Sequence, residues 1–226
     1  MRMRRKKHLE ERMQAVQPWF ADIGETTGGY DGIPFEAAPL DLAAIFGNDR
    51  PVDLEIGCGK GQFAAEYAAQ NPQRNLLAVE INGNVIVQAA EKAKAASLGN
   101  LRFLRIGAQH LGVLLKKDSI QRIFLNFSCP FPKKRQQKRR LTHPDFLELY
   151  RGFLAQDGLL MQKTDNAQLF EFSLCALSGC GFVLREVSLD LHHSAVEGNI
   201  MTEYEQRFTA LGQPIYYLKA QKHGRD

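Results

Sequence analysis

The sequence predicts an α/β fold in which a mostly parallel sheet is covered by helices on both faces. From Pro51 onward, short apolar runs alternate with longer stretches of helical pattern. The apolar runs are nearly continuous, as in parallel strands that are buried on both faces. The first run leads straight into a glycine-rich turn and then a helix, an arrangement common at ligand sites of such sheets.

The predicted elements follow one another in alternation. The strands are expected at Val52 to Ile56, Leu76 to Ile81, Leu101 to Ile106, Ile120 to Phe127 and Leu159 to Lys163. The helices are expected at Gln62 to Gln70, Val85 to Ala96, Pro144 to Leu154 and Ala167 to Ser178. Two further strands are expected at the far edge of the sheet, at Phe182 to Leu189 and Ile215 to Ala220.

The residues before Pro51 have a mixed pattern that predicts no second domain. They hold a basic start, a glycine-rich stretch at residues 27–32 and one short helical run, Leu40 to Phe46. We expect residues 1–50 to form an N-terminal basic arm and lead-in, and residues 51–226 to form one domain, since 226 residues suffice for one sizeable core.

Positive charge is concentrated in two clusters. The chain has 29 lysine and arginine residues against 25 acidic residues, a formal charge of +4. Five of the positive residues lie within residues 1–7, and six more lie within residues 133–140. The rest of the chain is acidic, which is the distribution expected when a polyanion is bound at one place.

The cysteines and apolar runs exclude several classes of protein. Four cysteines form no C-x-x-C pair, and no histidines stand at zinc-like spacing, so neither a disulfide framework nor a metal site is expected. No apolar run approaches the ~20 residues of a membrane-spanning helix, and the N-terminus lacks the apolar segment of a secretory signal. We expect a cytoplasmic protein with no membrane partner.

A glycine-rich turn follows the first predicted strand. Gly57, Gly59 and Gly61 allow a ligand to approach the main chain at the carboxyl end of the strand. The spacing is neither the G-x-G-x-x-G of dinucleotide binders nor a Walker loop. Glu80 stands 23 residues after the first glycine, where a carboxylate can accept both hydroxyls of a ribose. S-adenosylmethionine, a nucleoside without phosphate, fits best.

The alternative is a tight turn with no ligand and a solvated Glu80. Glu55, just before the turn, favours a bound ligand over this alternative.

A cationic loop follows the fourth predicted strand, between Asn126 and Thr142. Pro130 and Pro132 stiffen it. In a doubly wound sheet this loop is expected to overlook the cofactor crevice, where cations can contact phosphates. A charge run is usually only a solvated face, but its place in an otherwise acidic chain favours nucleic acid. The six cations are Lys133, Lys134, Arg135, Lys138, Arg139 and Arg140.

Two later polar segments are candidates for binding a base. Asp165 follows the fifth predicted strand and could accept from the two adjacent N–H donors of guanine, although a helix N-cap is the commoner role for such a residue. The segment from Thr202 to Glu205, with Asp190 to His193 before it, could also hold a base, but such clusters are commonly polar helix turns. His192 and His193 have no partners that indicate a metal.

Four motifs together resemble the bacterial tRNA (guanine-N7)-methyltransferase family, over residues from about Pro51 to Tyr216. They are Leu-Glu-Ile-Gly-Cys-Gly-Lys-Gly, Asn-Phe-Ser-x-Pro-x-Pro-Lys-Lys-Arg-x-x-Lys-Arg-Arg-Leu-Thr, Lys-Thr-Asp-Asn and Gly-Asn-Ile-Met-Thr-Glu-Tyr-Glu. The resemblance implies the class I S-adenosylmethionine-dependent methyltransferase fold, which is Rossmann-like. It also implies S-adenosylmethionine as cofactor and a guanine of the tRNA variable loop as substrate.

The resemblance also implies roles for individual residues. The cofactor-binding positions are Glu55, Gly57, Gly59, Glu80, Gly107 and Cys129. The substrate-binding positions are Lys133, Asp165, Thr202, Glu203, Tyr204 and Glu205, and the RNA-binding positions are Arg135, Lys138, Arg139 and Arg140. The catalytic positions are Cys129 and Asp165.

The chain departs from the family at four of its positions. Gly107 and Cys129 stand where the family has aspartate, and Phe131 and Gln136 replace its tryptophan and histidine. Guanine N7 carries a lone pair and no proton, so methyl transfer needs positioning more than a general base. A nearby carboxylate would still stabilise the cationic product ring, and its loss could cost roughly 10² to 10³ in rate. A thiol cannot replace it unless ionised.

The primary hypothesis is therefore a tRNA (guanine-N7)-methyltransferase that acts as a monomer or homodimer. The departures at Gly107 and Cys129 motivate an alternative, a catalytically weakened or inactive relative that acts as an RNA-binding protein. The cation run disfavours a third class, a small-molecule methyltransferase.

Overall fold

The computed structural model describes residues 8–24 and 38–224. They form two compact units, which meet in the sequence between Leu114 and Leu115. The first basic cluster, within residues 1–7, and the glycine-rich stretch at residues 27–32 lie outside the described residues.

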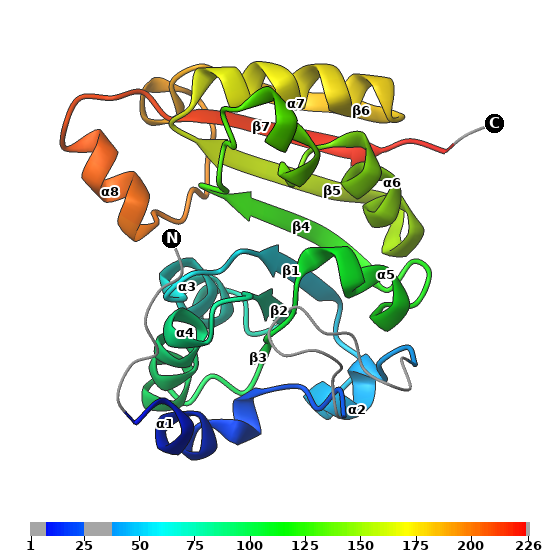
Figure 1. Ribbon diagram of the computed structural model, residues 1–226, viewed down its shortest axis with the longest axis vertical. Helices are drawn as coiled ribbons and strands as arrows, with labels where there is room; N and C mark the ends of the chain where they lie inside the picture. Colours follow the sequence, from blue (N-terminus) through cyan, green and yellow to red (C-terminus); the bar gives the residue numbers. More distant parts are fainter. Residues whose placement is uncertain (1–7, 25–37, 225–226) are drawn as a thin grey trace. The chain divides into compact units, whose positions relative to one another are not determined.

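The first unit is built on three parallel strands, β1 (Val52–Ile56), β2 (Asn75–Val79) and β3 (Leu101–Leu104), in the order β3-β2-β1. Every residue of β1 and β2 is buried, as expected for parallel strands that are covered on both faces. Helices α3 (Gln62–Gln70) and α4 (Gly83–Ala95) pack against each other and against these strands (Figure 1).

The described part of the lead-in packs onto the first unit. It comprises α1 (Leu9–Ala15), the short 3₁₀ helix η1 (Gln17–Trp19) and α2 (Leu42–Phe46). Arg12 of α1 donates two hydrogen bonds of 2.7 and 2.6 Å to Glu91 of α4, and Phe20 pairs with Phe103 of β3. Helix α1 was not predicted, because its seven residues have no clear apolar period. The division of the chain at residue 50 stays a prediction.

The second unit is built on β4 (Ile120–Asn126), β5 (Leu154–Thr164), β6 (Phe182–Ser188) and β7 (Tyr216–Lys222), in the order β4-β5-β7-β6. The strands β4 and β5 are parallel, whereas β7 runs antiparallel to both of its neighbours. The two additional strands are confirmed, and the last strand in the sequence lies between β5 and β6.

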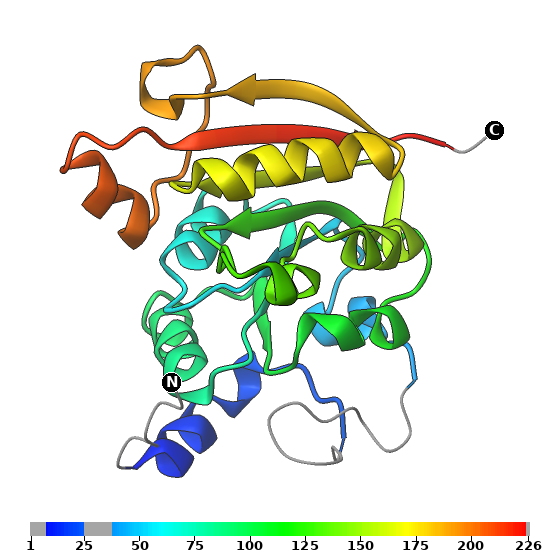
Figure 2. The ribbon, with the colours of Figure 1, turned by 45° about the horizontal axis from the view of Figure 1, so that its top comes forward.

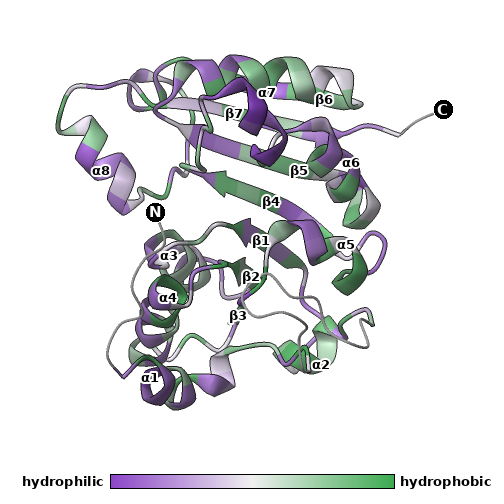
Figure 3. Ribbon diagram, viewed as in Figure 1, coloured by the Kyte–Doolittle hydropathy of each residue, from purple (hydrophilic) through white to green (hydrophobic). Residues whose placement is uncertain are grey.

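Helices α6 (Pro144–Phe153) and α7 (Ala167–Gly179) pack on this sheet. Figure 2 shows α7 lying along the strands, and Figure 3 shows that both helices carry hydrophobic and hydrophilic residues, as helices with one buried face do. The remaining helices are η3 (Ala108–His110) and α5 (Leu111–Leu114) in the first unit, and η4 (Lys134–Arg139), η5 (Leu191–His193) and α8 (Glu203–Thr209) in the second.

Most predicted bounds hold within one or two residues, but β5 begins at Leu154 and not at Leu159. Helix α6 ends at Phe153 because the backbone of Leu154 is already extended. The pairing of β5 with β4 then shifts register between Ile120 and Arg122, and Asp157 adopts a positive φ of 61°. The early part of β5 is thus an irregular strand, which an alternating or continuous apolar pattern does not reveal.

Within residues 8–24 and 38–224, no helix combines the length and the apolar character needed to cross a bilayer.

Candidate functional site

The glycine turn after β1 has the conformation that its sequence predicts. Gly57, Gly59 and Gly61 have φ values of 83°, 56° and 73°, a region that L-residues with a side chain rarely adopt. A Cβ at Gly57 or Gly59 would meet nothing within 4 Å, so the main chain there faces open space. A Cβ at Gly61 would collide with Ala89 of α4. The third glycine therefore serves the packing of α3 on α4.

Glu80 binds the glycine turn from the end of β2. Its carboxylate accepts hydrogen bonds from the N–H groups of Gly59, at 3.3 Å, and Asn82, at 2.9 Å. The side chain is half-buried and is thus less solvated than the alternative expected, while the presence of a ligand stays a prediction. A carboxylate has about four lone-pair sites, which leaves capacity for the two hydroxyls of a ribose. Glu55 lies in β1 and is 2% exposed.

The charges of these two glutamates act on the thiol of Cys58. Burial first, and then the charges of Glu55 and Glu80, raise the pKa of the Cys58 thiol well above its ordinary value. The thiol is therefore protonated at neutral pH, and a thiol is a far weaker nucleophile than a thiolate.

We expect iodoacetamide near neutral pH to modify Cys129 and Cys175, which are exposed, much faster than Cys58. Peptide mass mapping of the folded protein over time measures the three rates. Buried Cys180 is the internal control for slow reaction caused by burial. Alkylation of Cys58 at the rate of Cys129 would contradict the environment described above.

Gly107 lies just after β3, before η3, with an ordinary φ of −74°. A Cβ at this position would lie 2.5 Å from the side-chain amide of Gln109. An aspartate here would therefore need only a rotation of the flexible Gln109 side chain. The cofactor-binding role of Gly107 stays a prediction.

The loop after β4 contains two aromatic residues in a rare backbone conformation. Phe127 and Phe131 have φ values of 51° and 40°, which is uncommon for bulky residues and concentrated at functional sites. The N–H of Phe127 donates to the carbonyl of Lys163, at 2.8 Å, which ties the loop to the end of β5. Cys129 lies in this loop with an exposed side chain, and its catalytic and cofactor-binding roles stay predictions.

Arg140 differs from the other predicted RNA-binding residues. It is 5% exposed, and its guanidinium donates to the carbonyls of Pro130, at 2.9 Å, and Phe131, at 3.3 Å. It also lies 4.5 Å from the ring centre of Phe172. Arg140 thus holds the loop together, and its expected contact with phosphate finds no support. The other five cations of the run are exposed: Lys133, Lys134, Arg135, Lys138 and Arg139.

Asp165 and Asn166 have separate roles at the start of α7. The side chain of Asn166 accepts the N–H of Leu169, at 2.8 Å, and is the N-cap. Asp165 is exposed and does not cap the helix. The capping alternative therefore applies to Asn166, and the carboxylate of Asp165 faces solvent at the end of β5.

Lys163 and Glu205 form a buried ion pair that the sequence pattern does not predict. The Lys163 ammonium donates to Glu205, at 2.6 Å, and to the carbonyl of Ile200 and the side chain of Asn199, at 2.7 and 3.0 Å. The two charged side chains are 5% and 0% exposed. Nε2 of His192 lies 3.1 Å from the other oxygen of Glu205. The pair thereby fixes the segment before α8 to β5.

Four predicted substrate-binding residues begin α8 and divide into two kinds. Thr202 and Glu205 form a capping box, in which each side chain accepts the backbone N–H of the other residue. Both are buried, so in this conformation they hold the helix start, as in the polar helix turn weighed as the alternative. Glu203 is half-buried and Tyr204 is exposed, so these two have surface available for a ligand.

The predicted residues divide between the two units. Glu55, the glycines and Glu80 form the set of the first unit, and Asp165 and the start of α8 belong to the second. Across residues 8–24 and 38–224, no group of three or more histidine, cysteine or acidic residues could hold a metal ion. That no metal takes part stays a prediction.

Comparisons with known proteins find relatives by sequence and by fold. A family model described as a putative methyltransferase matches residues 49–218. A tRNA (guanine-N(7)-)-methyltransferase of Lysinibacillus sphaericus (strain C3-41) is 50% identical over 178 residues, which are 78% of this chain and 82% of the relative. A relative of the same name from Bacillus subtilis (strain 168) is 49% identical over 172 residues, 76% and 81% of the two chains.

Solved structures show the same fold at low identity. The antibiotic-resistance methyltransferase Kmr has a TM-score of 0.59 at 19% identity, and the match covers 89% of this chain and 99% of that chain. TrmN from Thermus thermophilus has a TM-score of 0.53 at 22% identity, covering 80% and 47%. The predicted class I methyltransferase fold is thereby confirmed.

Proposed function

Because this chain belongs to the family of tRNA (guanine-N(7)-)-methyltransferases, we propose that it transfers the methyl group of S-adenosylmethionine to N7 of a guanine in the tRNA variable loop. The observation that carries the proposal is the 50% identity over 178 residues to a relative of that name. The family predicted from the four sequence motifs is thereby confirmed. We also propose that the protein acts in the cytoplasm, as a monomer or a homodimer.

The first unit has features that fit S-adenosylmethionine. Gly57 and Gly59 open the main chain to a ligand, since a Cβ there would meet nothing within 4 Å. Glu80 is held against this turn by its bond to Gly59 and can accept from ribose hydroxyls. The sulfonium of the bound cofactor supplies an electrophilic methyl group. The acidic side chains nearby, Glu55 and Glu80, suit its positive charge.

The second unit has the group that suits a guanine. The exposed carboxylate of Asp165 can accept from N1–H and the exocyclic amine, which would orient N7 at the opposite edge of the base. The N7 lone pair forms the new bond to carbon while the carbon–sulfur bond breaks and its electrons remain on sulfur. Positive charge passes to the purine ring, and no proton has to be removed during the transfer. Positioning therefore contributes most of the catalysis.

The substitution at Cys129 bears on the rate. Because Cys129 stands in place of the family's aspartate, Asp165 is the exposed acidic residue among those assigned to guanine binding. We expect Asp165→Asn to lower kcat/KM by roughly 10² to 10³, because an amide neither accepts as strongly nor balances the ring charge. Asn166→Ser is the control. Serine also caps helices, and residue 166 has no proposed contact with the guanine.

Purified protein, labelled S-adenosylmethionine and an unmodified tRNA transcript test the proposed function. We expect one methyl group per tRNA, located at a variable-loop guanine by chain cleavage at 7-methylguanine, and none when that guanine is replaced by adenine. Binding of tRNA without methyl transfer would overturn the proposal and favour the RNA-binding alternative. Recovery of transfer in Cys129→Asp with Gly107→Asp would then identify the cause.

The two neighbouring arginines of the loop are expected to respond differently. Arg139→Ala should cost at most about 1 kcal/mol of stability, because its exposed guanidinium lies 4.6 Å from the ring centre of Phe131. It should also reduce the salt dependence of tRNA binding by about one unit of slope, because a proposed phosphate contact is lost. Arg140→Lys should cost about 1–3 kcal/mol of stability, because lysine cannot bind both carbonyls and stack on Phe172. Urea denaturation and filter binding at several salt concentrations measure both. Equal loss of stability in the two variants would contradict the assignment.

A further inference from the structure

We propose that Phe127, Tyr204 and Phe208 form a stacking platform for the guanine that is methylated, and that the platform favours this base in its cationic, methylated form. The proposal rests on the proposed function and adds to it how the base is held and how its charge is balanced.

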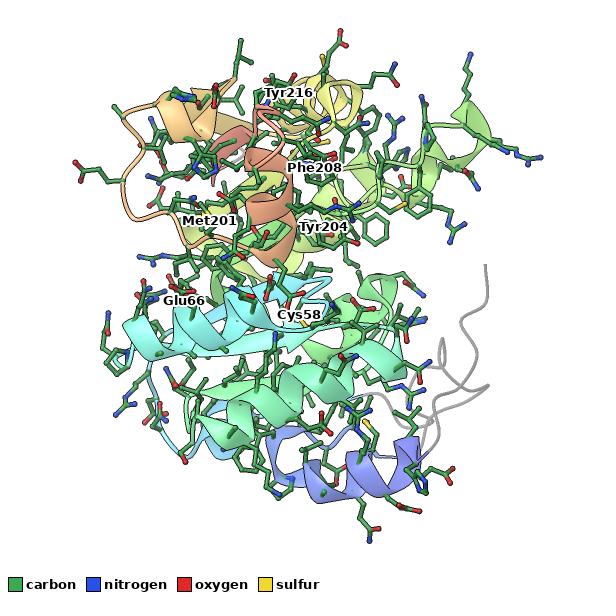
Figure 4. The ribbon with its side chains drawn as sticks, turned by 90° about the vertical axis from the view of Figure 1, so that its left-hand side faces the viewer. Cys58, Glu66, Met201, Tyr204, Phe208 and Tyr216 are labelled. Atoms are coloured by element: carbon green, nitrogen blue, oxygen red, sulfur yellow. The ribbon has the colours of Figure 1, made fainter. Side chains whose placement is uncertain are left out.

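The three rings come from two distant segments and share one orientation. Phe127 follows β4, whereas Tyr204 and Phe208 project from α8, one helical turn apart (Figure 4). The ring planes are within 15–27° of parallel, and the three centroid distances are 6.2, 6.5 and 6.3 Å. Such separations are at the long end of the range for aromatic contacts, so the three rings form a loose, nearly parallel group.

The platform is exposed, which distinguishes it from the aromatic pairs of the core. The exposed fraction of Tyr204 is 61%, and Phe127 and Phe208 are half-buried. In the stacked pair of Phe170 and Tyr216, at 5.2 Å, Phe170 is only 3% exposed. An aromatic surface that is open to solvent on a nucleic-acid-binding protein is suited to stacking a base.

Lys163 holds both halves of the platform in place. Its carbonyl accepts the N–H of Phe127, and its ammonium binds Glu205, the neighbour of Tyr204. The positive φ of Phe127 is therefore maintained by the end of β5, two residues before Asp165. The rings and the carboxylate that would bind the base edge are anchored to the same short segment.

The platform also suits the charge that the reaction creates. Guanine is neutral, but the ring carries a positive charge once N7 is methylated. The face of an aromatic ring attracts a cation through its quadrupole, most strongly where water is excluded. The platform would thus bind the base more tightly as the charge develops, which is the condition for lowering the barrier.

Nucleotide binding tests the platform without requiring methyl transfer. The probes are 7-methylguanosine 5′-monophosphate, whose fluorescence is quenched by stacking, and guanosine 5′-monophosphate as its competitor. We expect the methylated nucleotide to bind about 3- to 10-fold more tightly to the native protein, in the range of an exposed to half-buried cation–π contact. Tyr204→Leu should abolish the difference, and Tyr204→Phe should retain it.

Leu211→Ala is the matched control, because Leu211 is an equally exposed apolar residue just beyond α8, at 66%. It should leave the preference unchanged. Phe127→Leu should reduce the preference, which tests the second segment of the platform. The proposal is overturned if the native protein shows no preference, or if Tyr204→Leu keeps it.

Kinetics with tRNA separate this proposal from the proposed function. Tyr204→Leu should lower kcat about tenfold while Tyr204→Phe stays within about twofold of the native rate. If the native protein transfers the methyl group and Tyr204→Leu has the same kcat, the platform is refuted and the proposed function is not. A native protein that prefers the methylated nucleotide but transfers no methyl group refutes the proposed function alone.

Discussion

Replacing Lys163 with methionine is expected to destabilise the protein by about 3–5 kcal/mol, because it leaves the Glu205 carboxylate buried without its cation. Glu205 has no exposed surface, so its carboxylate is shielded from solvent in the folded protein. The same change frees the start of α8 and with it Tyr204. Methyl transfer should therefore fall further than the fraction of folded protein does. Urea denaturation and kcat measured under folding conditions provide the two values.

The effect of Lys163→Met can be separated from the loss of any lysine. Lys219 binds Glu186 at 3.0 Å, but their side chains are 34% and 42% exposed, so Lys219→Met should cost no more than about 1 kcal/mol. Adding Glu205→Met to Lys163→Met should restore much of the stability, since the buried charge is then removed. A double variant less stable than Lys163→Met would contradict the ion-pair explanation.

Replacing Arg74 with methionine is expected to have an effect of similar size in the first unit. Asp53 lies in β1 with no exposed surface, and Arg74 donates two hydrogen bonds of 2.6 Å to it. Tyr67 donates a third, at 2.5 Å. Removing the guanidinium leaves a buried carboxylate with the hydroxyl of Tyr67, so we expect a loss of about 3–5 kcal/mol in the free energy of unfolding.

The pH dependence of this contribution has a definite sign. The hydrogen bonds to Asp53 raise the pKa of Arg74 above its ordinary value, so the arginine is charged in the folded protein throughout the neutral range. Its contribution is fully present below the pKa of the unfolded chain and is lost only at strongly alkaline pH. The difference between native protein and Arg74→Met should thus be constant from pH 7 to about 9.

Arg12 supplies the matched control for Arg74. It also makes a two-pronged contact, with Glu91, but these side chains are 31% and 38% exposed. Arg12→Met should cost less than about 1 kcal/mol, as exposed ion pairs do. If both variants lose the same stability, burial is not what sets the strength of the Asp53 pair.

Local sequence patterns predicted much of the fold because turns and caps are marked by particular residues. β1 and α3 have the predicted bounds, since glycines separate them and fix the intervening turn. The irregular start of β5 escaped prediction because Asp157 adopts a backbone conformation that its residue type does not require.

The residue pairings that were missed depend on contacts between distant segments. Lys163 and Glu205 are 42 residues apart, and no periodicity indicates that they pair. Phe127 and Tyr204 likewise come from different elements. The available signal for the ion pair of Lys163 and Glu205 was a lysine at the end of an apolar strand. Arg140 could not be told from Arg139 in the sequence, because only the folded loop supplies the carbonyls that it binds.

The position of β7 has a consequence for how the protein forms during synthesis. β7 is the last strand in the sequence, yet it lies between β5 and β6 and pairs with both. Until the ribosome has released Tyr216 to Lys222, the nascent chain exposes one edge of β5 and both edges of β6. Unpaired strand edges promote aggregation, so the second unit depends on its final segment for protection during translation.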